Sequence, residues 1–125
     1  MKKIFLGIAL IMGLVSFGQS DPEVIVNTLK TADAVKLSGY FDEYVDIKLL
    51  DKPELKNMGR TQAGLTLKSF FSENGVTGFE KTSQRDMSGT MYLTGKLQNG
   101  NKGNNITIMM KMKDGKWQII TLRIS

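Results

Sequence analysis

The sequence contains no cysteine and no histidine among its 125 residues. Without cysteine the fold has no disulfide framework, and no thiol is available to bind a metal or to carry a lipid. Without histidine the chain lacks the commonest metal ligand and the side chain that most readily acts as acid and base near neutral pH. We therefore expect no metal and no other cofactor.

The charge pattern argues against nucleic-acid binding. The chain carries 17 basic and 12 acidic residues, a net charge of +5. A nucleic-acid footprint requires a clustered stripe of Lys and Arg. The basic residues here are spread along the chain, so we expect no nucleic-acid partner.

The first 18 residues have the pattern of a cleavable signal peptide. Residues 1–3 are a short basic start, and residues 4–15 are uncharged and mostly apolar. Small residues at Ser16 and Gly18 predict cleavage after Gly18, which would leave a single exported domain of residues 19–125, periplasmic or extracellular. A membrane anchor is the alternative, but the apolar run is shorter than the roughly 20 residues that span a bilayer. Cleavage would also remove two lysines and lower the net charge to +3.

The last twenty residues predict a β-hairpin. Two alternating apolar stretches, 105–113 and 116–124, are joined by Asp114 and Gly115. A two-residue loop of this composition suits a type I′ turn, which needs a positive φ at both positions.

A two-residue loop also fixes the register of this hairpin. The predicted pairs on one face are Met112–Trp117, Met110–Ile119 and Ile108–Thr121, and those on the other are Lys111–Gln118, Met109–Ile120 and Thr107–Leu122. Both faces are apolar over much of their length, so we expect the hairpin to be covered on both sides.

The rest of the chain predicts three helices and three further strands. Helices are expected from Pro22 (capped by Ser20 or Asp21), from Ala34 after a cap at Asp33, and from a cap at Thr61 to about Asn74. Strands are expected at Glu43–Leu50, Gly78–Met87 and Thr90–Gln98, and residues 55–60 are expected to form a loop.

The faces of two strands follow from alternation. In the first strand Val45, Ile47 and Leu49 share one face. In Gly78–Met87, alternation places Phe79 on the same face as Ser83 and Arg85. The loop after Met87 contains two or three residues, and this choice decides whether Asp86 shares a face with Tyr92.

Early helices followed by a meander of strands predict an α+β domain. We expect a curved antiparallel sheet of about five strands with three helices packed on its concave face. This order resembles the nuclear transport factor 2-like superfamily, a cone-shaped, cystatin-like fold. The resemblance rests on residues 33–41 leading into a strand, on the helix that ends in Phe70 and Phe71, and on the ending 114–124. The length and the export signal are similar to those of exported bacterial families of unknown function.

The resemblance implies a pocket between the sheet and the helices. The candidate lining residues are Tyr40, Tyr44, Asp46, Arg85, Asp86, Tyr92, Met110 and Trp117. Each has an alternative structural role. An aspartate on an alternating strand commonly faces water, and Trp117 with Met110 can anchor the core instead of forming a ligand floor.

Three functions are compatible with these features. The first is an exported, non-catalytic binding or accessory domain for a small apolar or amphipathic molecule, with no stable membrane anchor after cleavage. The second is a dehydratase- or isomerase-type enzyme in which Asp46 meets Tyr40 or Tyr92 within hydrogen-bond reach. The third is a homodimeric interaction module that associates through the open face of its sheet.

Overall fold

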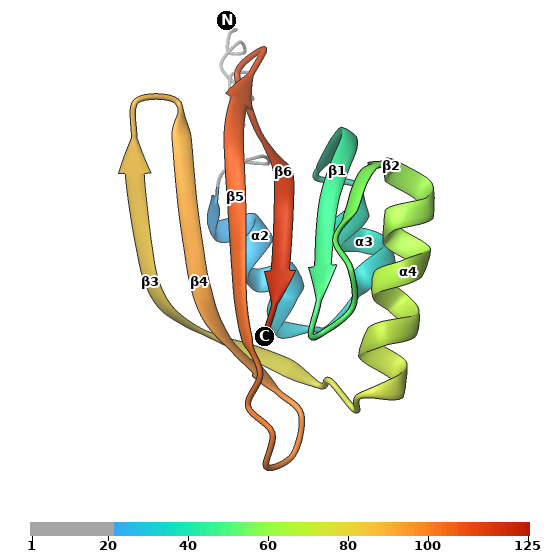
Figure 1. Cartoon of the computed structure of the whole chain (residues 1–125). Coiled ribbons are helices and arrows are strands. Elements are labelled where there is room, and N and C mark those ends of the chain that lie inside the picture. Colours follow the sequence, from blue (N-terminus) through green and yellow to red (C-terminus); the bar gives the residue numbers. More distant parts are fainter. Residues whose placement is uncertain (1–21) are drawn as a thin grey trace, which may run out of the picture.

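The computed structural model describes residues 22–125 (Figure 1). The predicted signal peptide, its cleavage site and the expected caps Ser20 and Asp21 lie outside this range. The elements, in chain order, are α2 (Pro22–Lys30), α3 (Ala34–Ser38), β1 (Phe41–Leu49), β2 (Leu55–Gly59), α4 (Arg60–Glu73), β3 (Gly78–Met87), β4 (Thr90–Gln98), β5 (Asn105–Lys113) and β6 (Lys116–Ile124). The domain is therefore α+β, as predicted.

Local sequence signals set the helix boundaries. α2 begins at Pro22, whose fixed φ suits the first helical position. α3 is capped by Asp33, whose Oδ1 accepts a hydrogen bond of 3.0 Å from the backbone N–H of Lys36. The predicted cap of α4 at Thr61 is wrong. That helix begins at Arg60, two residues earlier than a cap at Thr61 implies, and its N-cap is Gly59, which has no side chain to accept a bond.

The six strands form one sheet in the order β2-β1-β6-β5-β4-β3. All neighbouring pairs are antiparallel except β1 and β6, which run parallel. The expectation of about five strands missed β2, because residues 55–59 lack apolar alternation and were expected to form a loop. The sheet is also not fully antiparallel, since only four of its five neighbouring pairs are. Asn57 in β2 has a φ of 55°, and the pairing with β1 is irregular between Val45 and Ile47.

The C-terminal hairpin forms around Asp114 and Gly115, both with positive φ, as predicted. Its predicted register holds from the loop to the pair of Met110 with Ile119. Beyond this point the prediction is wrong, because Ile120 forms a β-bulge. The pairs that follow are Met109 with Thr121, Ile108 with Leu122, Thr107 with Arg123 and Ile106 with Ile124.

The β3–β4 hairpin has a two-residue loop, which settles its register. Met87 pairs with Thr90, and Arg85 pairs with Tyr92. A second bulge lies between Lys81 and Ser83. This bulge reverses the alternation along β3, so the prediction that Phe79 shares a face with Ser83 and Arg85 is wrong.

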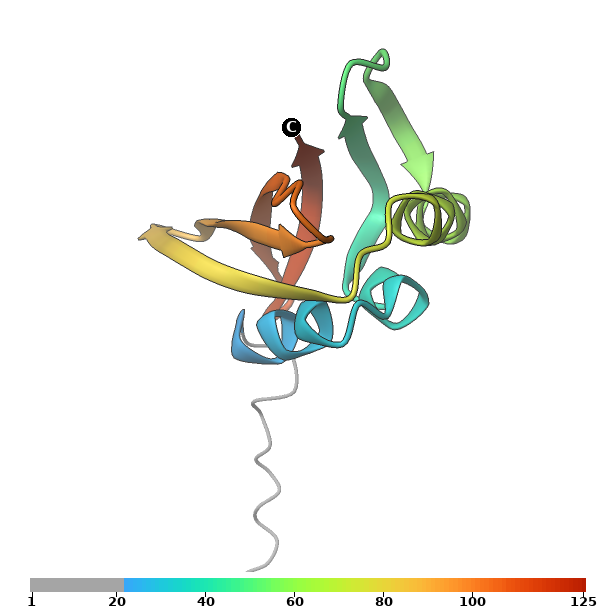
Figure 2. The same ribbon diagram turned by 90° about the horizontal axis from the view of Figure 1, so that it is seen from below.

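The core lies between the helices and one face of the sheet. The three helices pack on this face, and in Figure 1 α2 and α3 lie behind the strands; Figure 2 shows the same arrangement from below. The largest fully buried side chains are Phe41, Ile25, Leu29, Leu37, Ile47, Leu67, Leu93, Leu97, Ile106, Ile108, Met110 and Ile119. They come from α2, α3, α4 and the four strands β1, β4, β5 and β6, and Phe79 of β3 belongs to the same cluster. One core therefore joins the helices to the sheet.

The opposite face of the sheet is not covered by any element of residues 22–125. We call it the open face, meaning the side chains of β1 and β3–β6 that alternate with the core residues. Thr107, Met109 and Tyr92 on this face are each partly exposed. The expectation that the C-terminal hairpin is covered on both sides is therefore wrong for the described chain. Its second apolar stripe is short, because the bulge at Ile120 brings Thr121 opposite Met109.

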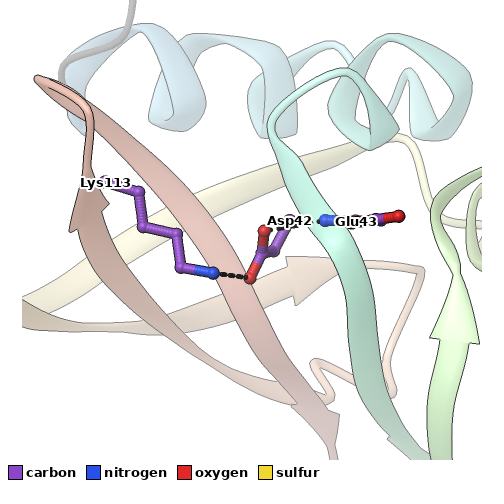
Figure 3. A network of polar contacts seen from close by, with 3 residues as sticks. All are labelled: Asp42, Glu43 and Lys113. Atoms are coloured by element: carbon purple, nitrogen blue, oxygen red, sulfur yellow. Dashed lines mark hydrogen bonds and ion pairs between the residues drawn. The ribbon is translucent and has the colours of Figure 1, made fainter.

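An ion pair spans three strands on the open face. Lys113 at the tip of β5 extends across β6 to Asp42 on β1, with 2.6 Å between Nζ and Oδ2 (Figure 3). The other oxygen, Oδ1, accepts a 2.8 Å bond from the backbone N–H of Glu43. The hydrogen bond from Lys113 lowers the pKa of Asp42 below its ordinary value, against the opposing effect of partial burial.

We expect Asp42→Asn to lower the free energy of unfolding at pH 7 by about 0.5–1 kcal/mol, because the lysine is well exposed and such pairs are screened by solvent. The pKa of Asp42 is lower in the folded chain than in the unfolded one. The contribution of the pair is therefore present at neutral pH and disappears as the pH falls through the lowered pKa. Urea unfolding as a function of pH measures this. Asp86→Asn is the control, since Asp86 forms no ion pair within residues 22–125. A difference that persists unchanged at acid pH would contradict the assignment.

Gly95 on β4 allows this strand and the edge strand β3 to approach each other. A Cβ at this position would lie 2.3 Å from the carbonyl oxygen of Glu80 and 2.4 Å from the ring of Phe79. We expect Gly95→Ala to destabilise the fold by about 2 kcal/mol or more, because neither the backbone nor the buried ring can move freely. Gly59→Ala is the matched control, since nothing lies within 4 Å of its Cβ position. Gly59→Ala should lower the free energy of unfolding by less than about 1 kcal/mol, because it only replaces a favourable cap residue. Equal melting temperatures for the two variants would contradict this account.

Candidate functional site

The predicted pocket residues lie on both faces of the sheet. Met110 is fully buried on the core face, and Trp117 is partly buried and packs against the same core. Tyr92 and Arg85 lie next to each other on the open face. These side chains therefore do not line one common cavity.

The remaining candidates lie on or beside β1. Tyr40 precedes the strand and packs, partly buried, against the core. Tyr44 is 56% exposed. The Oδ1 of Asp46 accepts a 2.8 Å hydrogen bond from the backbone N–H of Asn57, so this carboxylate supports the irregular β1–β2 pairing.

Asp46 and Tyr92 do share a row across the open face. Strand pairing connects them through Thr121 and Met109, so they are three inter-strand steps apart. At about 4.8 Å per step, their backbones lie roughly 14 Å apart. This distance is too large for an acid and a tyrosine that act on the same atoms.

The structure shows a different depression, between α2 and β3, which we call the α2–β3 groove. It has a volume of about 880 Å³ and is lined by Pro22, Glu23, Val26, Asn27, Lys30, Phe79, Glu80, Lys81, Gln84 and Gln98. None of these residues was predicted as a site residue from the sequence. The residues of α2 are separated from those of β3 and β4 by about fifty positions or more. The bulge in β3 determines which residues of that strand face the helix.

The floor and one wall of the groove are held firmly. Val26 and Phe79 are 7% and 3% exposed and belong to the core. Gln98 is fixed at the end of β4, where its carbonyl oxygen accepts a 2.8 Å bond from the backbone N–H of Thr77. Its side-chain amide lies over Gly78, at the position that a Cβ would occupy. The groove thus has an apolar base with the Gln98 amide beside it.

The rim of the groove is polar and of mixed charge. It carries Glu23 and Lys30 from α2 and Glu80 and Lys81 from β3. Glu80 pairs with Lys96 and so stands at the edge between the groove and the open face. Lys81 donates a 3.1 Å hydrogen bond from Nζ to the Oε1 of Gln84, which orients that amide. Such a rim can bind polar groups of either sign, but it concentrates no single charge.

Two further observations bear on the chemistry of the chain. Residues 22–125 contain no cluster of three or more acidic side chains placed to hold a metal ion. In the same part of the chain, no helix is long and apolar enough to cross a lipid bilayer.

Comparison with solved structures supports the predicted fold. The chain is similar to a DUF4783 family protein from Bacteroides uniformis ATCC 8492, with a TM-score of 0.76 and 22% identity over 83% of this chain and 94% of that one. It is similar to a DUF4783 family protein from Bacteroides fragilis YCH46, with a TM-score of 0.72 and 25% identity over 83% and 96% of the two chains.

A more distant similarity defines the fold. A domain of unknown function with a cystatin-like fold from Nostoc punctiforme gives a TM-score of 0.60 at 15% identity, over 81% of this chain and 69% of that one. The fold is therefore nuclear transport factor 2-like, or cystatin-like, as the resemblance implied. Comparison with curated proteins gave no significant match.

The family comparison covers the whole of the described chain. The model of DUF4783, a domain of unknown function, matches residues 22–125, and this match includes every helix and strand above. The chain therefore belongs to the DUF4783 family.

Proposed function

We propose that this protein is an exported, non-catalytic binding domain whose ligand occupies the α2–β3 groove. The observation that carries the proposal is the groove itself, an apolar base of Val26 and Phe79 under a polar rim. Its volume of about 880 Å³ falls within the range of roughly 300–1,000 Å³ typical of small-molecule sites. Export rests on the amino-terminal sequence pattern.

The lining favours an amphipathic ligand without a large net charge. The two buried apolar side chains offer contact to a hydrocarbon portion. The amides of Gln84 and Gln98 offer both donors and acceptors to a polar head. Two acidic and two basic residues balance each other at the rim, so neither an anion nor a cation gains a strong preference.

The arrangement of the titratable groups favours binding over catalysis. An enzyme of the carboxylate and tyrosine type needs an acid and a phenol within hydrogen-bond reach of one substrate. Asp46 is bonded to the Asn57 amide, and Tyr92 lies two intervening strands away. The groove contains no tyrosine among its lining residues.

A substitution that fills the groove tests this proposal. Asn27 is exposed on α2 and lines the groove, so Asn27→Trp should place an indole over the base without disturbing the core. Lys68→Trp is the matched control, since it adds the same side chain to an exposed position on α4.

The measurement is the melting temperature with a panel of neutral and zwitterionic amphipaths: octyl glucoside, monoacylglycerols, lysophosphatidylcholine and apolar dipeptides. A ligand at about 100 times its Kd should stabilise the folded chain by about 2.7 kcal/mol. We expect at least one probe to raise the melting temperature of the wild type and of Lys68→Trp, and not that of Asn27→Trp. An equal response of both variants, or turnover of a bound probe, would contradict the proposal.

A further inference from the structure

The charges of the described chain are distributed unevenly between its two sides. The open face carries seven basic residues, which are Lys48, Arg85, Lys96, Lys111, Lys113, Lys116 and Arg123. It carries three acidic residues, which are Asp42, Asp46 and Glu80. Elsewhere residues 22–125 contain eight of each sign: Lys30, Lys36, Lys52, Lys56, Arg60, Lys68, Lys81 and Lys102 against Glu23, Asp33, Glu43, Asp51, Glu54, Glu73, Asp86 and Asp114. The positive excess is therefore concentrated on the open face, even though Glu54 reaches Arg123 there.

Several of these cations have no carboxylate partner. Asp42 pairs with Lys113, and Glu54 approaches Arg123 at 3.6 Å. Within residues 22–125, no ion pair involves Arg85, Lys111 or Lys116, and all three are exposed. The open face thus presents free positive charge to its surroundings.

The middle of the open face is less polar than its margin. Tyr92 on β4, Met109 on β5 and Ile120 at the bulge of β6 are partly exposed and lie on neighbouring strands. Tyr92 pairs directly with Met109. The bulge adds Ile120 to this patch, because two residues of β6 there oppose one residue of β5.

The basic residues surround this apolar centre. Arg85 lies beside Tyr92 on the edge strand, while Lys111 and Lys116 lie toward the hairpin tip. Arg123 on β6 and Lys48 on β1 are neighbours in the strand register, two residues along from the neighbours Thr121 and Asp46. An apolar centre with aromatic and methionine side chains inside a charged rim is the usual composition of a protein–protein interface.

We propose that the open face is a docking surface for a protein partner with an acidic rim around an apolar patch. A second copy of this chain fits less well, because an isologous contact would place the same basic rim against itself. A linear polyanion would favour cations aligned in a stripe. A lipid surface would favour apolar side chains that protrude beyond the basic residues, whereas Tyr92, Met109 and Ile120 are only partly exposed. Charge complementarity therefore selects an acidic protein surface.

The experiment measures the binding of two fluorescently labelled probes to the purified chain. One probe is polyglutamate, and the other is a short peptide of alternating Glu and Tyr. Fluorescence anisotropy measures both affinities over a range of salt. The peptide should bind more tightly than polyglutamate, and Met109→Ser should remove this difference. Binding of both probes should weaken with salt.

Charge-reversal variants locate the contact. The triple variant Arg85→Glu, Lys111→Glu, Lys116→Glu should weaken binding of the peptide by about tenfold or more. The control triple variant Lys52→Glu, Lys68→Glu, Lys102→Glu changes the net charge equally on exposed positions off this face, and should retain most of the affinity.

Other outcomes would overturn the proposal. Equal loss in both triple variants would mean that net charge alone drives binding. Tighter binding to vesicles of phosphatidylcholine with phosphatidylglycerol than to the peptide would assign the face to a lipid surface. A dimer in light scattering that the open-face variant alone dissociates would assign it to self-association. Absence of binding to the peptide would also contradict the proposal. The Asn27→Trp variant, which blocks the groove, should bind both probes normally. The docking proposal and the groove proposal can therefore fail independently of each other.

Discussion

The parallel pairing of β1 with β6 joins the two halves of this chain. β1 follows directly after α3, and β6 is the last strand of the C-terminal meander. Their contact brings Phe41 beside Ile119 and Ile47 beside Leu122, and all four side chains are buried. Without it, the helical half and the meander would each expose an apolar face. The ion pair between Asp42 and Lys113 reinforces this junction from the solvent side.

This junction also gives the sheet two faces of different character. The three helices pack on one face and build the core there. The bulges in β3 and β6 then determine which side chains reach each face near the edge and in the centre. The first bulge places Phe79 in the core beside α2, where it forms the base of the groove, and the second adds Ile120 to the open face. Both proposed binding surfaces therefore depend on local irregularities of a regular sheet.

Much of the fold follows from local sequence signals. Pro22, Asp33 and the pair Asp114-Gly115 each determine nearby backbone geometry, and their elements form where the sequence predicts them. Alternation in β1 correctly places Val45, Ile47 and Leu49 on one face, which is the face that packs in the core.

The features that sequence patterns miss depend on tertiary contacts. A bulge adds one residue without changing composition, so neither the register beyond Ile120 nor the reversal near Ser83 is visible in the pattern. The strand β2 exists because β1 offers it an edge, and its own sequence alternates poorly. The groove joins residues of α2 to residues of β3 and β4, and no local signal connects them. Tyr92 and Arg85 were predicted to line a pocket between the sheet and the helices, and the structure places both on the open face.

The central claim is that the sheet is buried on one face and accessible on the other. Because the chain contains no cysteine, a single introduced thiol reports on its own site. Met109→Cys and Met110→Cys place that thiol on opposite faces of β5, where Met109 is partly exposed and Met110 is 0% exposed. The measurement is the rate of reaction with a maleimide in native buffer, compared with the rate in denaturant. The structure predicts that the thiol at 109 reacts readily in the native state and the thiol at 110 reacts only after unfolding. Equal protection of both thiols, or the reverse order, would contradict the one-sided fold.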